Sequence, residues 1–389
     1  MRILLHSLSS SGGLAEHTHY QARTFWAMGL DVEVLCPSDF LQGRKLDYPT
    51  RRIYRPFEKR KRANGISTDL PRVLANIWNL LVVQWRLAFA VAARRPDVVL
   101  LDSYMEYLSP LWIWPHLLLS KILGITYIAN LHDPVRDLVV GPRFWHHISV
   151  RLSFLPLDFC VVHQHFPDRR SIPSGVQLIE APVGVYDLQE TDIDPKEVRR
   201  EWGVKDDKVV FLSFGFIRDN KNVDLLIRAL SRNPDAVLVV MGSAQSSKNK
   251  PLQFYRDLAS QVGVADRVIF REEFVPDEAL RGYFSAADVI AITYDGSFHS
   301  QSGVLNIAAR ARRPVLASSG ESPLRSSVEK FCLGVFVEPD SEAAVAAGMG
   351  TLCRQLRAGD CGSEPDWDGY EQHASWERNA EVIFEAISG

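Results

Sequence analysis

The chain has 389 residues and a net formal charge of −3, and 46% of its residues are hydrophobic. This composition supports two ordinary hydrophobic cores but hardly three, and the acidic balance argues against nucleic acid as a partner. Five cysteines without a Cys-x-x-Cys pair indicate a reduced, intracellular protein. The apolar start is too short for a secretion signal. No segment reaches the roughly 18 uninterrupted apolar residues of a membrane helix, and residues 111–125 come nearest. We therefore expect a cytoplasmic protein.

Apolar segments of strand length alternate with helical patterns along the chain. They cover residues 2–7, 31–36, 97–101, 126–131, 159–163, 209–214, 236–241, 267–270, 288–293 and 314–318. Because these segments are apolar almost without interruption, we expect parallel sheets covered by helices on both faces. A polar stretch without periodicity at residues 184–195 indicates a linker between two such α/β halves.

The first predicted strand ends at a glycine turn, Ser9-Ser-Ser-Gly-Gly-Leu14, which opens a helix. Gly12 and Gly13 have no Cβ to keep the backbone away from a ligand. The turn can therefore approach an anion closely.

Cations are concentrated in the first half of the chain. Between residues 51 and 62 they are Arg51, Arg52, Arg55, Lys59, Arg60, Lys61 and Arg62. An apolar helix follows at residues 78–93, and this combination suits an anionic lipid surface. The alternative is a solvated loop before a core helix. Only Tyr54 and Phe57 are interleaved with the cations, which disfavours a nucleic-acid site.

Two cations stand beyond the end of a buried strand in the second half. The strand at residues 209–214 leads into Gly215-Phe-Ile-Arg-Asp-Asn-Lys221, and an apolar helical stripe follows at Val223, Leu226, Ile227 and Leu230. Arg218 and Lys221 therefore lie in a strand-to-helix loop, where open α/β sheets bind ligands. The alternative is a solvated pair of loop residues.

A small-residue turn feeds a short helix and then a buried strand between Ser300 and Ser318. Ser302 and Gly303 stand where the first free N–H groups of the helix would point, and a helix N-terminus attracts phosphate. The packed face of this helix is predicted at Val304, Ile307, Ala308 and Ala311. Its open end then remains for a ligand. An ordinary helix cap is the alternative interpretation.

Together these motifs resemble the family-four retaining glycosyltransferases of GT-B fold. In the second half the resemblance is carried by Phe214-Gly-Phe-Ile-Arg-Asp-Asn-Lys221, Met241-Gly242, Phe274-Val-Pro-Asp-Glu-Ala-Leu280, Ala286-Ala-Asp288, Gln301-Ser-Gly-Val304 and Pro314-Val-Leu-Ala-Ser318. In the first half it rests on Gly12-Gly13, on Asn130-Leu-His-Asp133 after a strand, and on the overall layout.

The resemblance implies an α/β fold of two Rossmann-like, doubly wound parallel-sheet domains that face a central cleft. Residues 1–188 would form the acceptor-side domain and residues 189–371 the nucleotide-sugar-binding domain. A C-terminal helix within residues 372–389 would cross back to the first domain.

The resemblance also implies roles for the motifs. Arg218 and Lys221 would neutralise the diphosphate of a nucleotide-sugar and stabilise the charge that grows on the leaving nucleotide, which is a catalytic role. The turn Gln301-Ser302-Gly303-Val304 would bind the same phosphates. Gly12 and Gly13 would close on these phosphates from the first domain.

Three further contacts are implied in the same way. Main-chain atoms around Phe274 and Val275 would meet the base. His132, after a strand of the first half, would contact the donor sugar or the acceptor hydroxyl in a catalytic role. A loop or structural role is the alternative for this histidine. His17, one turn into the first helix, would face the same mouth and contact the substrate.

Two features depart from the family pattern. Many members carry two glutamates seven residues apart, which fall near Ser300 and at Ile307 here, and neither position is acidic. The Gln-Ser-Gly-Val form resembles a branch without this acidic pair, so ribose recognition must come from elsewhere. Asn306 is adjacent but at a different helical angle. Arg312 replaces the glycine usually found two residues before the proline, and the sequence offers no explanation for it.

We expect neither a metal nor a cofactor. The family transfers sugars without a metal, and the chain has no Asp-x-Asp between strand and loop to hold a divalent ion under a diphosphate. No two acidic residues form an obvious acid/base pair. The closest histidine grouping along the chain is His163 and His165, without further ligands nearby in the sequence.

The sequence thus predicts a metal-independent, hexosyltransferase-like glycosyltransferase. It would move a sugar with retention from a nucleoside-diphosphate sugar to a glycan or lipid-linked acceptor, at the inner face of a membrane. A nucleotide-sugar epimerase would need cleft carboxylates that the sequence does not show. The other alternative is a catalytically inactive, transferase-like nucleotide-binding or scaffold subunit, which the missing glutamates favour and the retained Arg218 and Lys221 disfavour.

Overall fold

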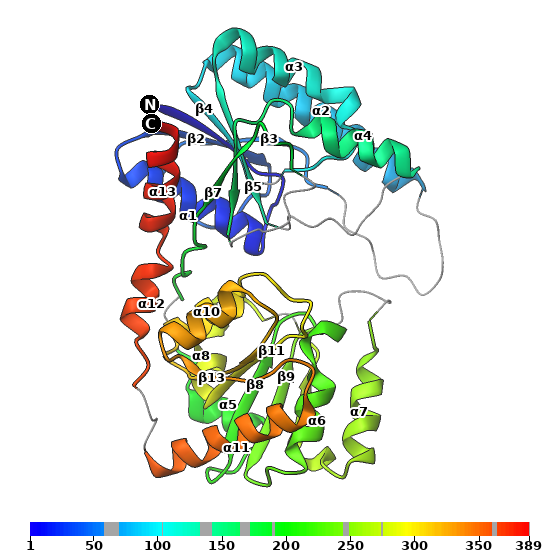
Figure 1. Cartoon of the computed structure of the whole chain (residues 1–389), viewed down its shortest axis with the longest axis vertical. Helices are drawn as coiled ribbons and strands as arrows, with labels where there is room; N and C mark the ends of the chain where they lie inside the picture. Colours follow the sequence, from blue (N-terminus) through cyan, green and yellow to red (C-terminus); the bar gives the residue numbers. More distant parts are fainter. Residues whose placement is uncertain are drawn as a thin grey trace. The chain divides into compact units, whose positions relative to one another are not determined.

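The computed structural model describes residues 1–57, 70–102, 104–132, 142–163, 172–188, 191–243, 249–273, 275–359 and 364–388 (Figure 1). The chain divides into two compact units. The N-terminal unit comprises Met1–Val183 with Trp376–Gly389, and the C-terminal unit comprises Gly184–Ser375. The chain therefore passes between the units at residues 183/184 and 375/376, a few residues from the predicted boundaries.

The N-terminal unit is built on a parallel sheet. In its described part the strand order is β3-β2-β1-β4-β5-β6-β7. The strands are β1 (Arg2–His6), β2 (Asp31–Pro37), β3 (Thr50–Tyr54), β4 (Val98–Leu101), β5 (Thr126–Leu131), β6 (Phe159–Val162) and β7 (Gln177–Glu180). The order reverses between β1 and β4. In open α/β sheets, ligands bind outside the carboxyl ends of the strands at such a reversal.

Helices cover both faces of this sheet (Figure 1). α1 (Gly13–Ala27) and α13 (Trp376–Ser388) pack on one face, and α2 (Leu70–Arg94), α3 (Ser109–Leu123) and α4 (Arg143–Ser153) pack on the other. Along β1, Ile3 and Leu5 enter the first core and Leu4 enters the second. Because both faces are buried, the strand is apolar at successive positions.

The C-terminal unit repeats this plan with the strand order β10-β9-β8-β11-β12-β13 in its described part. The strands are β8 (Val209–Phe214), β9 (Ala236–Met241), β10 (Val268–Arg271), β11 (Val289–Thr293), β12 (Val315–Ser318) and β13 (Gly334–Phe336). All the pairings are parallel. Here the order reverses between β8 and β11.

Two helical layers sandwich the second sheet. One contains α5 (Pro195–Glu201), α8 (Asp277–Ala286), α9 (Gly303–Arg310), α10 (Pro323–Lys330) and α12 (Trp367–His373). The other contains α6 (Val223–Leu230), α7 (Leu252–Gln261) and α11 (Glu342–Ala358), with α6 packed on α11. The 3-10 helices η2 (Asp219–Lys221) and η3 (Ala265–Arg267) lie in loops.

The predicted strands are confirmed, each to within one residue at either end. Three strands were not predicted, namely β3, β7 and β13, and all three are at sheet edges. Residues such as Arg51 and Arg52 in β3 and Gln177 in β7 are exposed. An edge strand pairs on one side only and is partly solvated, so it lacks the continuous apolar run that identifies a central strand.

Candidate active site

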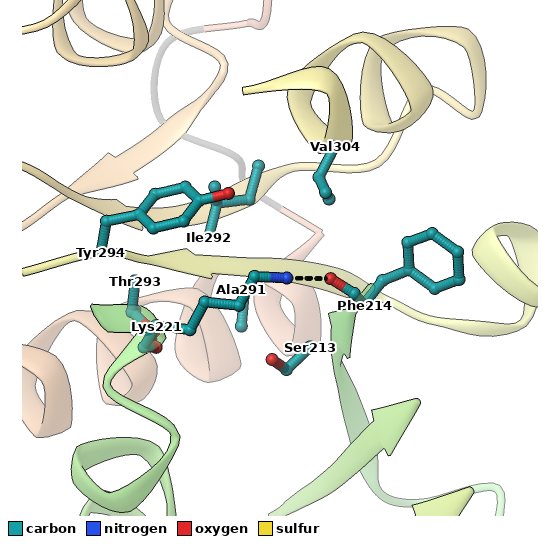
Figure 2. A pocket seen from close by; sticks show the side chains of 8 residues that line it. All are labelled: Ser213, Phe214, Lys221, Ala291, Ile292, Thr293, Tyr294 and Val304. Carbon is teal, nitrogen blue, oxygen red and sulfur yellow. Dashed lines mark hydrogen bonds between the residues drawn. The ribbon is translucent and has the colours of Figure 1, made fainter. Parts of the chain in front are cut away.

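The loop after β8 and the helix after β11 meet at a small cavity at the strand reversal of the C-terminal unit (Figure 2). We call this cavity the β8–β11 pocket. Its lining residues are Ser213, Phe214, Lys221, Ala291, Ile292, Thr293, Tyr294 and Val304. Arg218 and the turn that precedes α9 adjoin it in sequence, so the predicted phosphate-binding motifs converge on one edge of the sheet.

Lys221 is held at the pocket by the backbone. Its Nζ donates a hydrogen bond to the carbonyl oxygen of Phe214 at 2.6 Å (Figure 2). Its own carbonyl accepts one from Thr293 Oγ1 at 3.0 Å. Burial, helped by the charge of Arg218, lowers the pKa of Lys221 to about 8. Among the residues that the structure describes, no carboxylate forms an ion pair with Lys221, so the unliganded protein holds this cation at a cost.

Arg218 lies exposed just before η2, with its guanidinium carbon 5.9 Å from the ring centre of Phe216. Within the described residues it has no ion pair with a carboxylate. Its charge acts on both Lys221 and Tyr294, which places the three groups in one electrostatic neighbourhood. The arrangement concentrates positive charge at the pocket instead of neutralising it.

Tyr294 was not predicted as a site residue. Its hydroxyl lies 3.4 Å from Ser302 Oγ. Burial raises its pKa, although the hydrogen bond between the two hydroxyls and the charge of Arg218 act in the opposite direction. A neutral phenol at this place can donate a hydrogen bond to an anion. The available sequence signal was its position, directly after the end of β11.

Two glycines explain how Lys221 fits against the backbone. Gly215 has φ 93°, and a Cβ there would lie 3.2 Å from Lys221 Nζ. Gly242 has φ 144°, and a Cβ there would lie 2.0 Å from the carbonyl oxygen of Gly215. Glycine is therefore required at the ends of both β8 and β9, which is a physical reason for the Met241-Gly242 motif.

α9 begins where the sequence predicted. Ser302 is its N-cap residue, but the serine side chain does not cap the helix. Gly303 is exposed, and the N–H of Leu305 is bonded to Ser302 O at 3.0 Å. The N–H groups of Gly303 and Val304 belong to the first turn and have no acceptor within the helix. These two N–H groups leave the N-terminal end of α9 open, whereas the side chain of the preceding Gln301 is hydrogen-bonded to Tyr370.

The predicted packed face of α9 is confirmed in part, because Ala308 is buried and Val304, Ile307 and Ala311 pack against the core. The buried residues are Leu305, Asn306, Ala308 and Ala309, whereas Val304, Ile307 and Ala311 are half-buried. Asn306 Nδ2 donates to Gly184 O at 3.2 Å, and its Oδ1 accepts from the Tyr370 hydroxyl at 2.6 Å. Asn306 therefore has a structural role and does not replace the missing ribose ligand.

The backbone conformation explains why glycine is usual in the family at the position that Arg312 occupies here. Arg312 has φ 52°, in the left-handed region where glycine has no steric cost. It follows the end of α9, a place where a left-handed residue commonly ends a helix. Its guanidinium lies 2.6 Å from Asp368, in an ion pair that is half-exposed or more on both sides.

A second polar cluster lies at the strand reversal of the N-terminal unit. Asp102 directly follows β4 and is completely buried. It accepts hydrogen bonds from His17 Nδ1 at 2.6 Å, Thr18 Oγ1 at 2.6 Å, Asn130 Nδ2 at 2.9 Å and His132 Nε2 at 3.3 Å. We call these five residues the Asp102 network. Sequence reasoning missed Asp102, and its signal was an acidic residue directly after an apolar strand.

The electrostatics of the Asp102 network favour an ionised carboxylate beside neutral imidazole. Burial opposes ionisation of Asp102, but the contacts with His17 and His132 outweigh it and hold its pKa well below the usual value. Burial lowers the pKa of His17 despite the attraction of Asp102. Neutral His17 then carries its proton on Nδ1, where it donates to the carboxylate.

The structure separates the two predicted histidines by accessibility. The side chain of His17 is 2% exposed and that of His132 is 22% exposed. His132 is therefore the better placed of the two for a ligand contact, and His17 positions Asp102. Gly12 is the N-cap of α1 and Gly13 its first residue, and both are exposed.

The predicted base contacts are described only in part. Phe274 lies outside the described residues. Val275 is buried in the core between β10 and α8, so only its backbone can meet a ligand.

Comparisons with known proteins agree with this geometry. Residues 194–355 match the family model described as glycosyl transferases group 1. A D-inositol 3-phosphate glycosyltransferase of Mycobacteroides abscessus is 36% identical over 168 residues, which are 43% of this chain and 37% of that protein. The chain thus matches less than half the length of this curated relative.

Solved structures match over the whole chain. Anabaena HepE in complex with UDP and glucose has a TM-score of 0.69 at 16% identity, covering 100% of this chain and 99% of that one. Sucrose-phosphate synthase from Thermosynechococcus elongatus has a TM-score of 0.68 at 16% identity, covering 100% and 98%. At this identity the similarity shows the fold.

Proposed function

We propose that this chain, whose C-terminal unit carries a glycosyltransferase group 1 domain within a GT-B fold, transfers a sugar from a nucleoside-diphosphate sugar to an acceptor. The main support for this proposal is that Arg218, Lys221 and the open N-terminus of α9 converge on the β8–β11 pocket. Two cations and helix N–H groups, without a carboxylate ion pair among the described residues, suit a diphosphate.

The same groups supply the catalytic role that we propose. When the bond between the sugar carbon and the diphosphate oxygen breaks, the leaving nucleotide gains negative charge. Lys221 and Arg218 stabilise that charge most strongly in the transition state. The acceptor oxygen forms the new bond to the sugar carbon, and its proton passes to the departing diphosphate, which leaves as the nucleoside diphosphate. We propose that the configuration at the sugar carbon is retained, as the family resemblance implies. We also propose that no metal ion binds the diphosphate, because the side-chain cations neutralise its charge.

The remaining contacts complete the proposal. His132 contacts the donor sugar or the acceptor hydroxyl, held by its hydrogen bond to Asp102. The backbone around Val275 meets the base, and Gly12 and Gly13 approach the phosphates. Since HepE has been crystallised with UDP and UDP-glucose, a uridine diphosphate sugar is the first donor to test.

An exposed apolar surface on α2, α3 and α4 supports a membrane-presented acceptor. It consists of Leu74, Trp78, Trp85 and Phe89 on α2, Leu111, Trp114, Leu118 and Ile122 on α3, and Phe144 and Ile148 on α4. Trp78 and Phe89 are each 70% exposed. The residues on each helix recur at three-, four- or seven-residue spacing, so each helix presents a stripe. Soluble monomers rarely expose so many large apolar side chains together.

Charge favours an anionic lipid surface as the partner of this face. The three helices contain Arg72, Arg86, Arg94, Lys121, Arg143 and Arg151, of which Arg94 is paired with Glu33, and none of their residues is Asp or Glu. Basic amphipathic helices bind the interface of anionic membranes. We therefore propose that the N-terminal unit docks on the cytoplasmic face of a membrane that carries a glycan or lipid-linked acceptor.

The structure revises which segments would make this contact. Residues 72–94 of α2 are long and apolar enough to cross a membrane by length and composition alone, so residues 111–125 are not the nearest candidate. However, Leu80, Leu87 and Val91 on the inner side of α2 pack into the core, which favours a surface contact. In the predicted basic segment, Arg51 pairs with Glu33 at 2.5 Å. Lys59, Arg60, Lys61 and Arg62 lie outside the described residues.

The donor assignment is tested by thermal unfolding with UDP, GDP, ADP and their sugars, in EDTA. A ligand at 100 times its dissociation constant adds about 2.7 kcal/mol of apparent stability. We expect a shift with one base, lost in the double variant Arg218→Ala with Lys221→Ala. The matched control, Arg200→Ala with Lys205→Ala, removes two exposed cations from the same unit and keeps the shift.

The outcomes separate the candidate functions. Donor turnover that disappears in the Arg218/Lys221 variant supports transfer. Nucleotide binding without transfer to any glycan or lipid acceptor favours the scaffold alternative. A variant that turns over donor like the wild type would show that the diphosphate assignment is wrong.

Membrane docking is tested by flotation with vesicles of anionic or zwitterionic lipid. We expect binding to anionic vesicles that is lost in Trp78→Ser with Phe89→Ser. Trp26→Ser, which removes an exposed tryptophan from α1, is the control and keeps binding. Equal binding by both variants would contradict the proposed surface.

A further inference from the structure

Three histidines of the N-terminal unit come together although they are far apart in sequence. His17 lies on α1, His132 follows β5 and His163 follows β6. One ring nitrogen of each lies within 4.8 Å of one ring nitrogen of each of the others. The rings of His132 and His163 have centroids 5.2 Å apart, and those of His17 and His132 are 4.6 Å apart.

Two of these rings each have one nitrogen with a partner and one without. His17 Nδ1 donates to Asp102 Oδ1 at 2.6 Å, and its Nε2 is buried with no hydrogen-bond partner. His163 Nδ1 lies 3.2 Å from the carbonyl oxygen of Ala181, and its Nε2 is likewise buried without a partner. In the tautomers that these partners select, each Nε2 is an unprotonated lone pair. A buried polar atom without a partner requires an explanation.

We propose that His17, His132 and His163 bind a divalent transition-metal ion of the Zn²⁺ class. Three neutral imidazoles are a known ligand set for zinc and leave a fourth position for water. Imidazole also accepts copper and nickel, so Zn²⁺ is the class representative.

The surroundings match those of metal-binding histidines. Such a histidine usually donates its second ring N–H to a carboxylate or a backbone carbonyl, which fixes the ring and its tautomer. His17 does so to Asp102, and His163 does so to Ala181. The ionised Asp102 also supplies negative charge beside the cation. Both partners are therefore in place before an ion arrives.

Protons do not compete strongly with the metal ion for the nitrogens of His17 and His163. Burial, together with the neighbouring histidines, lowers the pKa of His163 well below its usual value, and burial lowers that of His17. Both rings are then neutral near pH 7, as metal ligation requires. The nitrogens would approach from at most 4.8 Å to about 3.4 Å, the separation set by zinc–nitrogen bonds of about 2.1 Å.

This site uses other residues than the proposed diphosphate chemistry. It shares His132 with the proposed contact to the sugar or acceptor, which the ion and its water would then make in place of the free imidazole. It lies wholly within the N-terminal unit, whereas Arg218 and Lys221 belong to the C-terminal unit. Its spacing along the chain concealed it, because only His163 and His165 are neighbours in sequence. Failure of nucleotide binding would therefore leave the metal proposal untouched.

The experiment is a metal titration of the full chain after treatment with a chelator. Zn²⁺ is added in competition with a chromogenic chelator, and Co²⁺ is added separately to record its visible ligand-field bands. We expect one equivalent of Zn²⁺ per chain and cobalt bands of a low-coordinate, nitrogen-ligated ion. His163→Ala should lose at least 100-fold in affinity. Asp102→Asn, which keeps the shape but removes the charge, should lose about 10- to 100-fold.

The control variant is His147→Ala, which removes an exposed histidine from α4 of the same unit and should bind like the wild type. No stoichiometric binding by the wild type overturns the proposal, as does unchanged affinity in His163→Ala. If His163→Ala does not fold, the wild type still decides. The proposal then requires two results from the wild type: Zn²⁺ must raise its melting temperature in a way that a chelator reverses, and Co²⁺ must give the expected spectrum. If either result is missing, the proposal is wrong.

Discussion

The two units place polar groups at the same topological position, the strand reversal, but treat them differently. In the N-terminal unit, four donors converge on the buried carboxylate of Asp102. In the C-terminal unit, Arg218 and Lys221 stand beside an open helix end, and no carboxylate of the described residues pairs with either. The first site pairs its buried carboxylate internally, and the second leaves its cations for an anion.

This difference indicates that the Asp102 network contributes mainly to the stability of the fold and the β8–β11 pocket mainly to ligand binding. Hydrogen bonds to a buried carboxylate stabilise the fold, and removing the carboxylate leaves desolvated donors. Unneutralised cations cost stability until a ligand arrives, and the ligand then gains the full interaction. We therefore expect substitutions in the Asp102 network to act mainly on folding, and substitutions at the β8–β11 pocket to act mainly on binding.

The largest effect is expected for Asp102→Ala. It leaves His17 Nδ1 and one N–H of Asn130 Nδ2 buried without an acceptor, whereas Thr18 Oγ1 keeps the carbonyl oxygen of Leu14. The free energy of unfolding of the N-terminal unit should therefore fall by about 3–5 kcal/mol. Because the pKa of Asp102 is lowered in the folded state, this stabilisation is present above pH 3.8 and is lost as the pH falls through the folded-state pKa. Denaturant unfolding at pH 7 and at acid pH measures it.

The control for that measurement is Asp47→Ala, which removes an exposed acid from the same unit and should change stability by less than about 0.5 kcal/mol. A loss for Asp102→Ala no larger than that of the control would remove the contrast between the two units.

Gly242→Ala tests the backbone that supports the pocket. The new Cβ would lie 2.0 Å from Gly215 O, so the loop that positions Lys221 must move. We expect a loss of about 1–3 kcal/mol in unfolding free energy and loss of the nucleotide-dependent thermal shift. Gly203→Ala is the matched control, since Gly203 has φ 68° and no atom within 4 Å of its added Cβ. It should cost about 1 kcal/mol and keep the shift. Equal behaviour of the two variants would refute the close-packing argument.

Lys221→Met tests the cost of the unneutralised cation. The folded-state pKa of about 8 lies below the usual 10.5, so the unfolded state binds more protons between these values. The stability of the unliganded protein therefore rises as the pH increases from 8 to 10.5, and the cost is fully present below pH 8. Melting temperatures at pH 7 and pH 10 should show the unliganded variant more stable than the wild type at pH 7, with the gap narrowing at pH 10. The nucleotide-dependent shift should be absent. A variant less stable than the wild type at pH 7 would contradict the desolvation argument.

The smallest effect is expected for Arg312→Gly in an Asp368→Ala background. Removing Asp368 first eliminates the 2.6 Å ion pair and leaves a 3.8 Å ion pair between Arg312 and Glu371, which is at the surface and contributes little. The second change therefore reports mainly the left-handed backbone of Arg312. Relief of that conformation should raise the unfolding free energy by about 0.5–1 kcal/mol, as a thermal scan can measure. A decrease would show that the arginine side chain contributes packing beyond this ion pair.

The central strands and the pocket motifs could be predicted because their signals are local. Each buried strand is a continuous apolar run, and Arg218, Lys221, Ser302 and Gly303 lie within a few residues of a strand end or a helix start. The edge strands β3, β7 and β13 carry no such run. The burial of Asn306 on α9 was not predicted, because it depends on Tyr370 and Gly184, both remote in sequence.

The sequence by itself determined the alternation of strands and helices, the two α/β halves and the positions of the phosphate-binding motifs. Only the tertiary structure decided that Asp102 joins His17 and His132, that His163 adjoins them, and that the neighbouring helices α2, α3 and α4 each expose apolar residues. The physical reason is the parallel sheet. Its carboxyl ends gather residues from β1, β4, β5 and β6 at one edge, although helices and loops separate them along the chain.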